Sequence, residues 1–382
     1  MLQADIRAPG ALLPEETAAW RAFQASAPAF ASPLLSPEFA TSVGRVRDDA
    51  RVVVFRDSGR IVGVFAHHRR PTAFGGGFAR GLGGPWSDEQ ALLTGPDGID
   101  WREAFAAAGL RACRFTGLID PHGVFEGAVQ DGEASYAIAF DGPADAYLER
   151  LRAASAKRFK NLRRLESKLD REVGPVTLTA PDIDPEALSL LLEWKRDQFR
   201  RTGVHDVLHP EWSRRLVQET FERRPGGVEG LLVTLRAGGR VVAGHYGLRA
   251  GAVYHPQIAA FDPAFSAFSP GMTLILNAIR AMPDLGIGRY ELSGGCGHYK
   301  AAFASEETPL REGLVDRGRA QDVAEPRRPL ILERARRRLD RIVETELTLS
   351  GRLAGVAGAL HDLPRRAASR IDPRSDVRQE EN

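Results

Sequence analysis

Hydrophobic positions along the chain follow two spacings, one typical of strands and the other typical of helices. Residues 51–55 and 60–66 are rich in β-branched side chains and flank a tight turn at residues 57–59. Residues 230–235 and 240–248 repeat that arrangement about 180 positions later. Short apolar runs joined by a glycine-containing turn are typical of β-hairpins. The sequence therefore predicts two hairpins of the same design.

Helical spacing dominates between these hairpins. Ser36 before Pro37 and Asp184 before Pro185 are typical helix starts, because the first side chain accepts from free amides and proline lacks the N–H that would stay unbonded. Further helices are predicted at residues 14–30, 101–108, 143–150, 155–171 and 210–223, strands at residues 113–118, 135–140, 253–261 and 289–292, and a glycine-rich loop at residues 72–86. Strands that alternate with helices indicate a mixed α/β (α+β) fold.

Identical residues recur at a constant offset, which indicates an internal repeat. The pairs are Arg56 with Arg236, Gly59 with Gly239, Arg60 with Arg240 and Val62 with Val242 at one offset, and Gly109 with Gly286 and Gly117 with Gly294 at a second. We interpret them as two tandem copies of one α/β unit. After the last glycine the first copy reads LIDPHG and the second GCGHYK. If one copy is catalytic, this divergence favours the second.

A chain of 382 residues is too long for one ordinary hydrophobic core. Together with the repeat, the length predicts a degenerate first domain at residues 1–150. A catalytic domain that begins with a basic linker helix is expected at residues 151–318. Residues 319–382 are predicted to form an Arg-rich helical extension and a flexible tail.

The overall charge and the cysteine content exclude several classes of protein. A formal net charge of +2 gives no indication of DNA as a partner. Cys113 and Cys296 are too few for a disulfide framework or a thiolate zinc site, so no metal is expected. No secretory signal is visible, and the uncharged run at residues 263–279 is interrupted by Pro270 and Gly271. These features predict a cytoplasmic protein.

Polar residues gather at residues 289–303, where a short strand runs into a glycine-rich turn and a predicted helix. That helix begins with His298, Tyr299 and Lys300. Side chains at a strand-to-helix junction lie at the open end of a sheet, where α/β proteins bind ligands. The chain has five lysines among its 52 basic residues, so Lys300 is unusual as a surface cation. The alternative is a structural turn with a solvated lysine.

A second candidate is the sequence Ser269-Pro270-Gly271-Met272, which we interpret as a helix start. Ser269 is expected to cap this helix, and Gly271 has no side chain to keep a ligand from the free amides. The positive end of a helix attracts phosphate. A proline–glycine helix start chosen only for its backbone geometry is the alternative.

These motifs together resemble the GNAT acyltransferase superfamily in its duplicated FemAB-like form, with the BioF2-like or CelD-type branch most similar. The resemblance rests on AFDPAFSAFSPGMTLI and YELSGGCGHYK and covers residues 34–316. It implies an acyl-CoA donor, such as acetyl-CoA, and an amino-sugar or glycan acceptor in exopolysaccharide or cell-envelope synthesis. Ser269, Gly271 and Met272 would then meet the pyrophosphate of the donor.

Acyl transfer to an amine needs a base, donors for the oxyanion and a proton for the leaving thiolate. Glu291 is the first candidate for the base, and Asp262 and His245 are the next. Backbone amides in the stretch from Ile258 to Ala260 are the expected oxyanion donors. Tyr299 is expected to protonate the thiolate, and Lys300 and His298 to contact phosphate or substrate.

Residues 155–171 carry seven basic and two acidic side chains, with the leucines at helical spacing. Lys157, Arg158 and Lys160 could contact a phosphate, and a solvated helix face is the alternative. FemAB-like relatives use aminoacyl-tRNA as the donor, so this basic segment keeps that alternative open.

The last residues are rich in arginine and are predicted to be disordered alone. Guanidinium groups bind phosphate and guanine, and carboxylates accept from the guanine ring. The residues suited to a cyclic dinucleotide are Arg365, Arg366, Arg370, Asp372 and Arg374. An acidic surface at the inner membrane would suit the same charges, as would an ordinary soluble tail. A nucleotide-sensing component of polysaccharide machinery is therefore the non-enzyme alternative.

Overall fold

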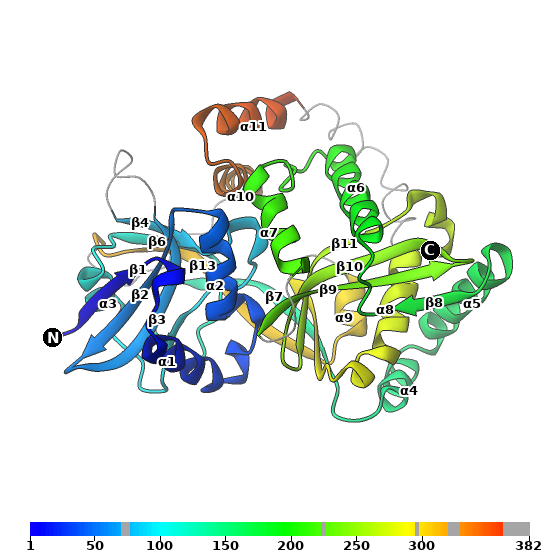
Figure 1. Ribbon diagram of the computed structural model, residues 1–382, viewed down its shortest axis with the longest axis horizontal. Coiled ribbons are helices and arrows are strands. Elements are labelled where there is room, and N and C mark those ends of the chain that lie inside the picture. Colours follow the sequence, from blue (N-terminus) through cyan, green and yellow to red (C-terminus); the bar gives the residue numbers. More distant parts are fainter. Residues whose placement is uncertain (70–76, 223–226, 295–297, 320–328, 362–382) are drawn as a thin grey trace. The chain divides into compact units, whose positions relative to one another are not determined.

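The computed structural model describes residues 1–69, 77–222, 227–294, 298–319 and 329–361 (Figure 1). It divides into two compact units, each built from separate stretches of chain. The first comprises Met1–Ala137, Arg215–Val228 and Glu291–Pro329, and the second Ile138–Arg214, Glu229–Tyr290 and Leu330–Asn382. The predicted boundaries at 150 and 318 define consecutive stretches, whereas each compact unit combines stretches from separate parts of the chain. This combination arises because the strand near the end of the second copy pairs with strands of the first unit.

The first unit contains a mixed sheet with helices around it. Its strands are β1 (Gln3–Arg7), β2 (Ala50–Asp57), β3 (Arg60–Arg69), β4 (Phe78–Gly81), β5 (Leu92–Thr94), β6 (Ala112–Leu118), most of β7 (Gln130–Ala139) and β13 (Glu306–Asp316). Its helices are α1 (Pro14–Ala25), α2 (Pro37–Val46), α3 (Trp101–Ala107) and α9 (His298–Phe303). Ser36 caps α2 as predicted, since its side chain accepts from the amide of Phe39 at 3.1 Å.

The second unit has the same mixed composition. Its strands are β8 (Val176–Thr179), β9 (Val228–Ala237), β10 (Arg240–Ala250), β11 (Val253–Phe261) and the start of β12 (Arg289–Gly294). Its helices are α4 (Ala144–Ala154), α5 (Ala156–Val173), α6 (Pro185–Thr202), α8 (Pro270–Ala281), α10 (Leu330–Thr345) and α11 (Leu349–His361), and α7 (Glu211–Glu222) is divided between the units. The predicted α/β class is confirmed by these elements.

Both units repeat one strand order. In the first, β2, β3 and β4 pair antiparallel, and β4 then pairs parallel with β6 through Ala79 and Cys113. In the second, β10 and β11 pair antiparallel, and β11 then pairs parallel with β12 through Tyr254 and Tyr290. An antiparallel run that ends in one parallel pair is an unusual order to find twice, so the shared order supports the interpretation as a repeat.

The strand β4 lies inside the region predicted to be a loop. Glycines on both sides hide it from a propensity argument, because strand formation depends more on neighbouring strands than on intrinsic preference. Its pairing with β3 and β6 supplies those neighbours.

Residues 88–90 of the first unit, which we call the plug, fill the wedge-shaped space where β4 and β6 separate. The amide of Gln90 donates to the carbonyl of Gly117 at 2.8 Å, and the amide of Ile119 donates to the carbonyl of Gln90 at 2.8 Å. A Cβ added at Gly117 would lie 1.9 Å from the carbonyl oxygen of Asp88, and one at Gly81 would lie 2.1 Å from the Gln90 side chain. This plug therefore leaves no space for a ligand beside Gly117.

Helices cover the sheet of the second unit on two faces (Figure 1). On one face, Leu191 of α6 would lie 3.3 Å from a Cβ at Gly244. On the other, Phe261 would lie 3.8 Å from a Cβ at Gly271 of α8. Neighbouring residues of a strand point to opposite faces, so Gly244, Ala260 and Asp262 belong to the α6 side and His245, Ala259 and Phe261 to the α8 side.

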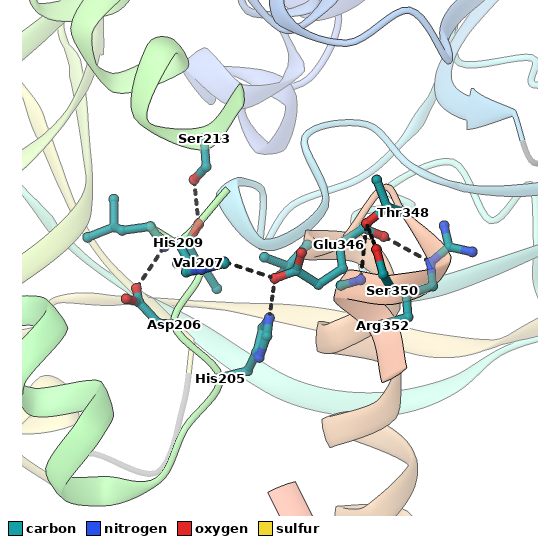
Figure 2. A network of polar contacts seen from close by, with 12 residues as sticks. His205, Asp206, Val207, His209, Ser213, Glu346, Thr348, Ser350 and Arg352 are labelled. Atoms are coloured by element: carbon teal, nitrogen blue, oxygen red, sulfur yellow. Dashed lines mark hydrogen bonds and ion pairs between the residues drawn. The ribbon is translucent and has the colours of Figure 1, made fainter. Parts of the chain in front are cut away.

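The described part of the C-terminal extension packs on the second unit through a polar network (Figure 2). The carboxylate of Glu346 lies 3.0 Å from Nε2 of His205 and 3.6 Å from Nδ1 of His209. The indole of Trp212 donates to the carbonyl of Thr345 at 2.9 Å. This network fixes the junction of α10 and α11 against the connection between α6 and α7, so the helical extension is anchored before residue 361.

Candidate active site

The residues predicted for the site fall into both units, and each is described within its own. The first unit holds Glu291, His298, Tyr299 and Lys300. The second holds Lys157, Arg158, Lys160, His245, Ile258, Ala260, Asp262, Ser269, Gly271 and Met272. Arg365, Arg366, Arg370, Asp372 and Arg374 lie outside the described residues.

The register of β11 decides which of its amides can face a ligand. The amide of Asp262 donates to the carbonyl of Val242 at 3.0 Å, which makes these two residues a hydrogen-bonded pair. Such pairs alternate along antiparallel strands, so Ala260 and Ile258 also direct their amides toward β10. Ala259, which lies between them in the predicted stretch, directs its amide toward the opposite edge.

The carbonyl of Ala259 confirms this orientation, because it accepts from the side chain of Lys195 at 3.3 Å. Lys195 is on α6, and its ammonium also lies 5.3 Å from the ring centre of Phe199. Sequence reasoning did not select Lys195. Its signal was the scarcity of lysine, the same argument that selected Lys300.

The start of α8 differs from the predicted cap. Ser269 has a left-handed backbone (φ 48°) and its side chain makes no capping bond, because that conformation turns the hydroxyl away from the helix amides. The amides of Met272 and Thr273 both donate to the carbonyl of Ser269 at 3.1 Å. Met272 therefore has no amide to offer a ligand. Within the described chain, the amide that α8 leaves unbonded in its first turn is that of Gly271.

The basic helix α5 comes close to this helix start through a residue that was not predicted. Lys168 lies 4.9 Å from the ring centre of Phe268, immediately before Ser269. Lys157, Arg158 and Lys160 are exposed two to three turns earlier on α5. The structure thus places Lys168 beside the start of α8, and the three predicted cations nearer the N-terminal end of α5.

Glu166 ties α5 to α8. It accepts from Arg280 at 2.6 Å and from Asn277 at 2.9 Å. Although burial opposes it, hydrogen bonds from Arg280 and Asn277 hold the pKa of Glu166 below its ordinary value. This charged bond keeps the cationic helix in place along α8.

His245 forms a buried polar pair with Tyr290, which the sequence did not indicate. The Nδ1 of His245 lies 2.5 Å from the Tyr290 hydroxyl, and the Tyr290 ring stacks on Tyr254 at 5.5 Å between ring centres. Burial raises the pKa of the Tyr254 hydroxyl well above its ordinary value. His245 is the register partner of Ala259. The His245–Tyr290 pair is therefore next to Ala259, the residue of β11 whose amide faces the edge.

In the first unit, Glu291 is buried with an exposed fraction of 4%. Strand alternation turns it away from the face of β12 that carries Tyr290, as predicted. Lys300 donates to the carbonyl of Gly294 at 2.7 Å, so its ammonium is already bonded to the end of β12. Tyr299 is partly buried on α9.

Asp262 acts as a turn residue and also borders a cleft. It accepts from the amide of Ala264 at 2.9 Å and lies 3.9 Å from Arg240. Asp262, Arg240 and Trp194 are among the residues that line a cleft in the second unit. The cleft was not visible in the sequence, since α6 and the β9–β10 hairpin contribute to it from positions about 50 residues apart.

The described residues contain neither a metal-binding cluster nor a membrane-spanning helix. No group of three or more His, Cys, Asp or Glu side chains lies close enough to hold a metal ion. None of the described helices combines the length and the apolar character needed to span a bilayer.

One family of known proteins matches part of the chain. The family described as Acetyltransferase (GNAT) domain matches residues 156–301. No curated protein matches the chain. The match confirms the prediction that the chain is an enzyme, an acyltransferase with a GNAT-type domain.

Three solved structures are similar at low identity. A tandem GNAT protein from the clavulanic acid biosynthesis pathway has 14% identity and a TM-score of 0.45, with 84% of this chain and 100% of that chain covered. FemX has 11% identity and a TM-score of 0.44, with 69% and 87% covered. A GCN5-related N-acetyltransferase from Sphaerobacter thermophilus has 12% identity and a TM-score of 0.41, with 84% and 98% covered.

Proposed function

We propose that this acyltransferase moves an acyl group, such as acetyl, from acyl-CoA to the amine of an amino sugar or glycan precursor. One observation carries the proposal: β11 directs the amide of Ala259 to its edge, and α8 presents the amide of Gly271 on the face to which Phe261 belongs. The carbonyl of a thioester needs a free hydrogen-bond donor such as the Ala259 amide, which stabilises the oxyanion. A pyrophosphate is bound by free amides at a helix start, such as that of Gly271.

In the reaction, the amine nitrogen attacks the thioester carbonyl carbon and loses a proton to a base. The carbon–nitrogen bond forms, the carbon–sulfur bond breaks, and the thiolate takes up a proton. The Ala259 amide would stabilise the oxyanion. His245 with Tyr290 is the proposed proton carrier within the second unit, because His245 is the register partner of Ala259 and bonds to the Tyr290 hydroxyl. Glu291, in the first unit, remains the base predicted from the sequence.

Lys168 would add a positive charge near the donor phosphates, since its ammonium lies beside Phe268, just before the start of α8. The motifs also resemble those of the N-acyltransferase of holdfast polysaccharide biosynthesis, so a precursor of that polysaccharide is included among the proposed acceptors. Exopolysaccharide synthesis is the proposed setting.

The Gly271 position offers a direct test. Replacing Gly271 with leucine should raise the KM for acetyl-CoA at least tenfold, because the new side chain would occupy the place proposed for phosphate. The fold should tolerate it, since the nearest atom to an added Cβ is 3.8 Å away. Gly271→Ala is the matched control, and removal of glycine from a helix stabilises by up to about 1 kcal/mol. Thiol release from acetyl-CoA with glucosamine as acceptor measures the KM, and thermal unfolding checks the fold.

A Gly271→Leu variant with an unchanged KM would contradict the donor site at α8. Absence of heat on titration with both acetyl-CoA and longer acyl-CoAs would contradict acyl-CoA as the donor.

The exposure of Lys157, Arg158 and Lys160 keeps a second donor, aminoacyl-tRNA, as an alternative. Replacing all three with glutamine should leave the KM for acetyl-CoA within about twofold if the donor is acyl-CoA. Each lost phosphate contact weakens nucleic-acid binding and lowers its salt dependence. If the wild type transfers an acyl group from charged tRNA and the triple variant does not, aminoacyl-tRNA is favoured as the donor.

A further inference from the structure

The cleft of the second unit has no role in the donor site described above. Its volume is about 280 Å³. The residues that line it are Asp184, Glu186, Ala187, Leu190, Trp194, Arg236, Arg240, Val241 and Asp262. Asp262 belongs to the α6 side of β11, whereas its neighbour Phe261 belongs to the side of Gly271. The cleft and the start of α8 therefore lie on opposite faces at the end of one strand.

One wall of the cleft is apolar. Trp194 and Leu190 are one turn apart on α6, so their side chains lie next to one another along the helix. Among the described residues 138–290, the exposed large hydrophobic side chains are Ile183, Leu190 and Phe261. Leu190 lines the cleft and Ile183 precedes the lining residue Asp184, whereas Phe261 belongs to the opposite face of β11. Exposed apolar side chains that gather around a concave site are typical of a ligand-binding surface.

The opposite wall is charged and held in position from behind. Arg236 donates to buried Asp182 at 2.9 Å and lies 3.6 Å from Asp184. Asp182 also accepts from Thr234 at 2.5 Å. Although burial opposes it, the bonds from Thr234, the Asp184 amide and Arg236 hold the pKa of Asp182 below its ordinary value. Arg236 is thus oriented before any ligand arrives.

We propose that this cleft binds one pyranose ring of an amino-sugar oligosaccharide, which deepens the proposed function and rests on it for the identity of the acceptor. A sugar ring has a flat C–H face, which packs on an aromatic ring, and hydroxyls that both donate and accept. Trp194 supplies the ring. The paired carboxylates and guanidinium groups supply acceptors and donors together.

The charged side chains that line the cleft favour some classes of sugar over others. Asp184, Glu186 and Asp262 carry three negative charges, against two positive charges on Arg236 and Arg240. The net charge of −1 favours an ammonium group over an acetamido group and disfavours phosphate. A polyamine would use the carboxylates but leave the guanidinium donors without acceptors, so it fits the cleft less well.

The distance between the cleft and Ala259 suits an oligosaccharide as the ligand. Asp262 lies three residues beyond Ala259, which is about 10 Å along a strand. The same helix supplies Trp194 to the cleft and, one residue later, Lys195 to the Ala259 carbonyl. A ring held against Trp194 therefore leaves a neighbouring sugar of the same chain close to the edge where the amide of Ala259 is directed.

Calorimetric titration of the full-length protein with a glucosamine tetramer tests the proposal without turnover. The wild type should bind this tetramer more tightly than the fully N-acetylated tetramer. Trp194→Ala should weaken binding at least tenfold, and Trp194→Phe, which keeps a ring, less than threefold. Glu186→Gln should weaken binding of the glucosamine tetramer only. Glu193→Gln, an exposed carboxylate on the same helix outside the cleft, is the matched control and should change nothing.

Equal affinity of the wild type and Trp194→Ala, no measurable binding of either tetramer, or tighter binding of spermidine than of the glucosamine tetramer would each overturn the proposal. Circular dichroism of each variant checks that it is folded. Failure of the proposed function is a distinct result, in which acyl-CoA is neither bound nor consumed, whatever the affinity for the oligosaccharides. In turnover, Trp194→Ala should raise the KM for the oligosaccharide while leaving that for acetyl-CoA unchanged.

Discussion

Replacing Gly117 with alanine should destabilise the first unit by more than about 3 kcal/mol, a larger effect than most overpacked positions show. The added Cβ would lie 1.9 Å from the carbonyl oxygen of Asp88. This oxygen belongs to the backbone of the plug, which cannot rotate away as a side chain can. The plug is also bonded to β6 by the two hydrogen bonds of Gln90, at 2.8 Å each. Relief of the clash would therefore break the pairing that fills the wedge.

Gly294, the repeat partner of Gly117, is the matched control. A Cβ there would lie 3.3 Å from the nearest atom, the carbonyl oxygen of Ala134, so Gly294→Ala should cost about 1 kcal/mol, well below the cost of Gly117→Ala. Urea unfolding of the two variants and the wild type measures the difference. Equal destabilisation by both substitutions would contradict the idea that the plug is specific to the first unit.

The repeat shows how far hydrophobic pattern and glycine position can predict the fold. Both hairpins were predictable because period-2 patterns and a glycine turn are local features. The equivalence of Gly117 and Gly294 was also visible in the sequence. The plug was not, since Asp88 and Gln90 fill the wedge through backbone hydrogen bonds that any residue type can make.

The candidate site was predictable to the level of the segment but not to that of the atom. Residues 253–261 were expected as a strand and form β11. The choice among the amides of Ile258, Ala259 and Ala260 depends on register, and a shift of one residue reverses it. Register is set by the pairing with β10, which the sequence of β11 alone does not contain.

The helix starts show a similar limit. Ser36 and Ser269 both precede proline, and the first caps its helix while the second does not. The difference lies in the backbone, which is extended at Ser36 (φ −88°) and left-handed at Ser269 (φ 48°), although each serine directly follows a 3-10 helix, Pro33–Leu35 and Pro263–Phe268. The residue type at the junction does not reveal which of these backbone conformations it adopts.

The first unit should lose stability in mild acid because of His67. Its ring is buried, with an exposed fraction of 1%, and stacks on Phe65 at 5.2 Å between ring centres. Burial, followed by the charge of His68, lowers the pKa of His67 to about 3. The unfolded chain binds a proton near the ordinary value of 6.5. Stability is therefore full above about pH 6.5 and is lost as the pH falls toward 3.

Between pH 7.5 and pH 5 this single group should cost about 2 kcal/mol. Asp49 does not act in this window. Although burial opposes it, hydrogen bonds from His68 and Arg47 hold the pKa of Asp49 well below its ordinary value, so its stabilising effect is lost only at lower pH. Among the groups near His67, Arg51 and Arg69 keep their charge throughout the window, and His68, which is hydrogen-bonded to Asp49, is present in both the wild type and a His67 variant, so its contribution cancels when the two are compared. The acid sensitivity is thus assigned to His67 rather than to the neighbouring carboxylate.

His67→Phe separates the acid effect from any change in packing. A phenyl ring keeps the stack on Phe65 and cannot bind a proton, so the variant should lose about 2 kcal/mol less than the wild type between the two pH values. Whatever the substitution costs through overpacking is present at both pH values and cancels in the difference. His209→Phe, at a side chain that is 69% exposed, should leave the pH dependence of the first unit unchanged. Urea unfolding at pH 7.5 and pH 5 measures all three proteins. If the wild type and His67→Phe lose stability in parallel, the buried imidazole is protonated in the folded state and the core around Phe65 must admit water.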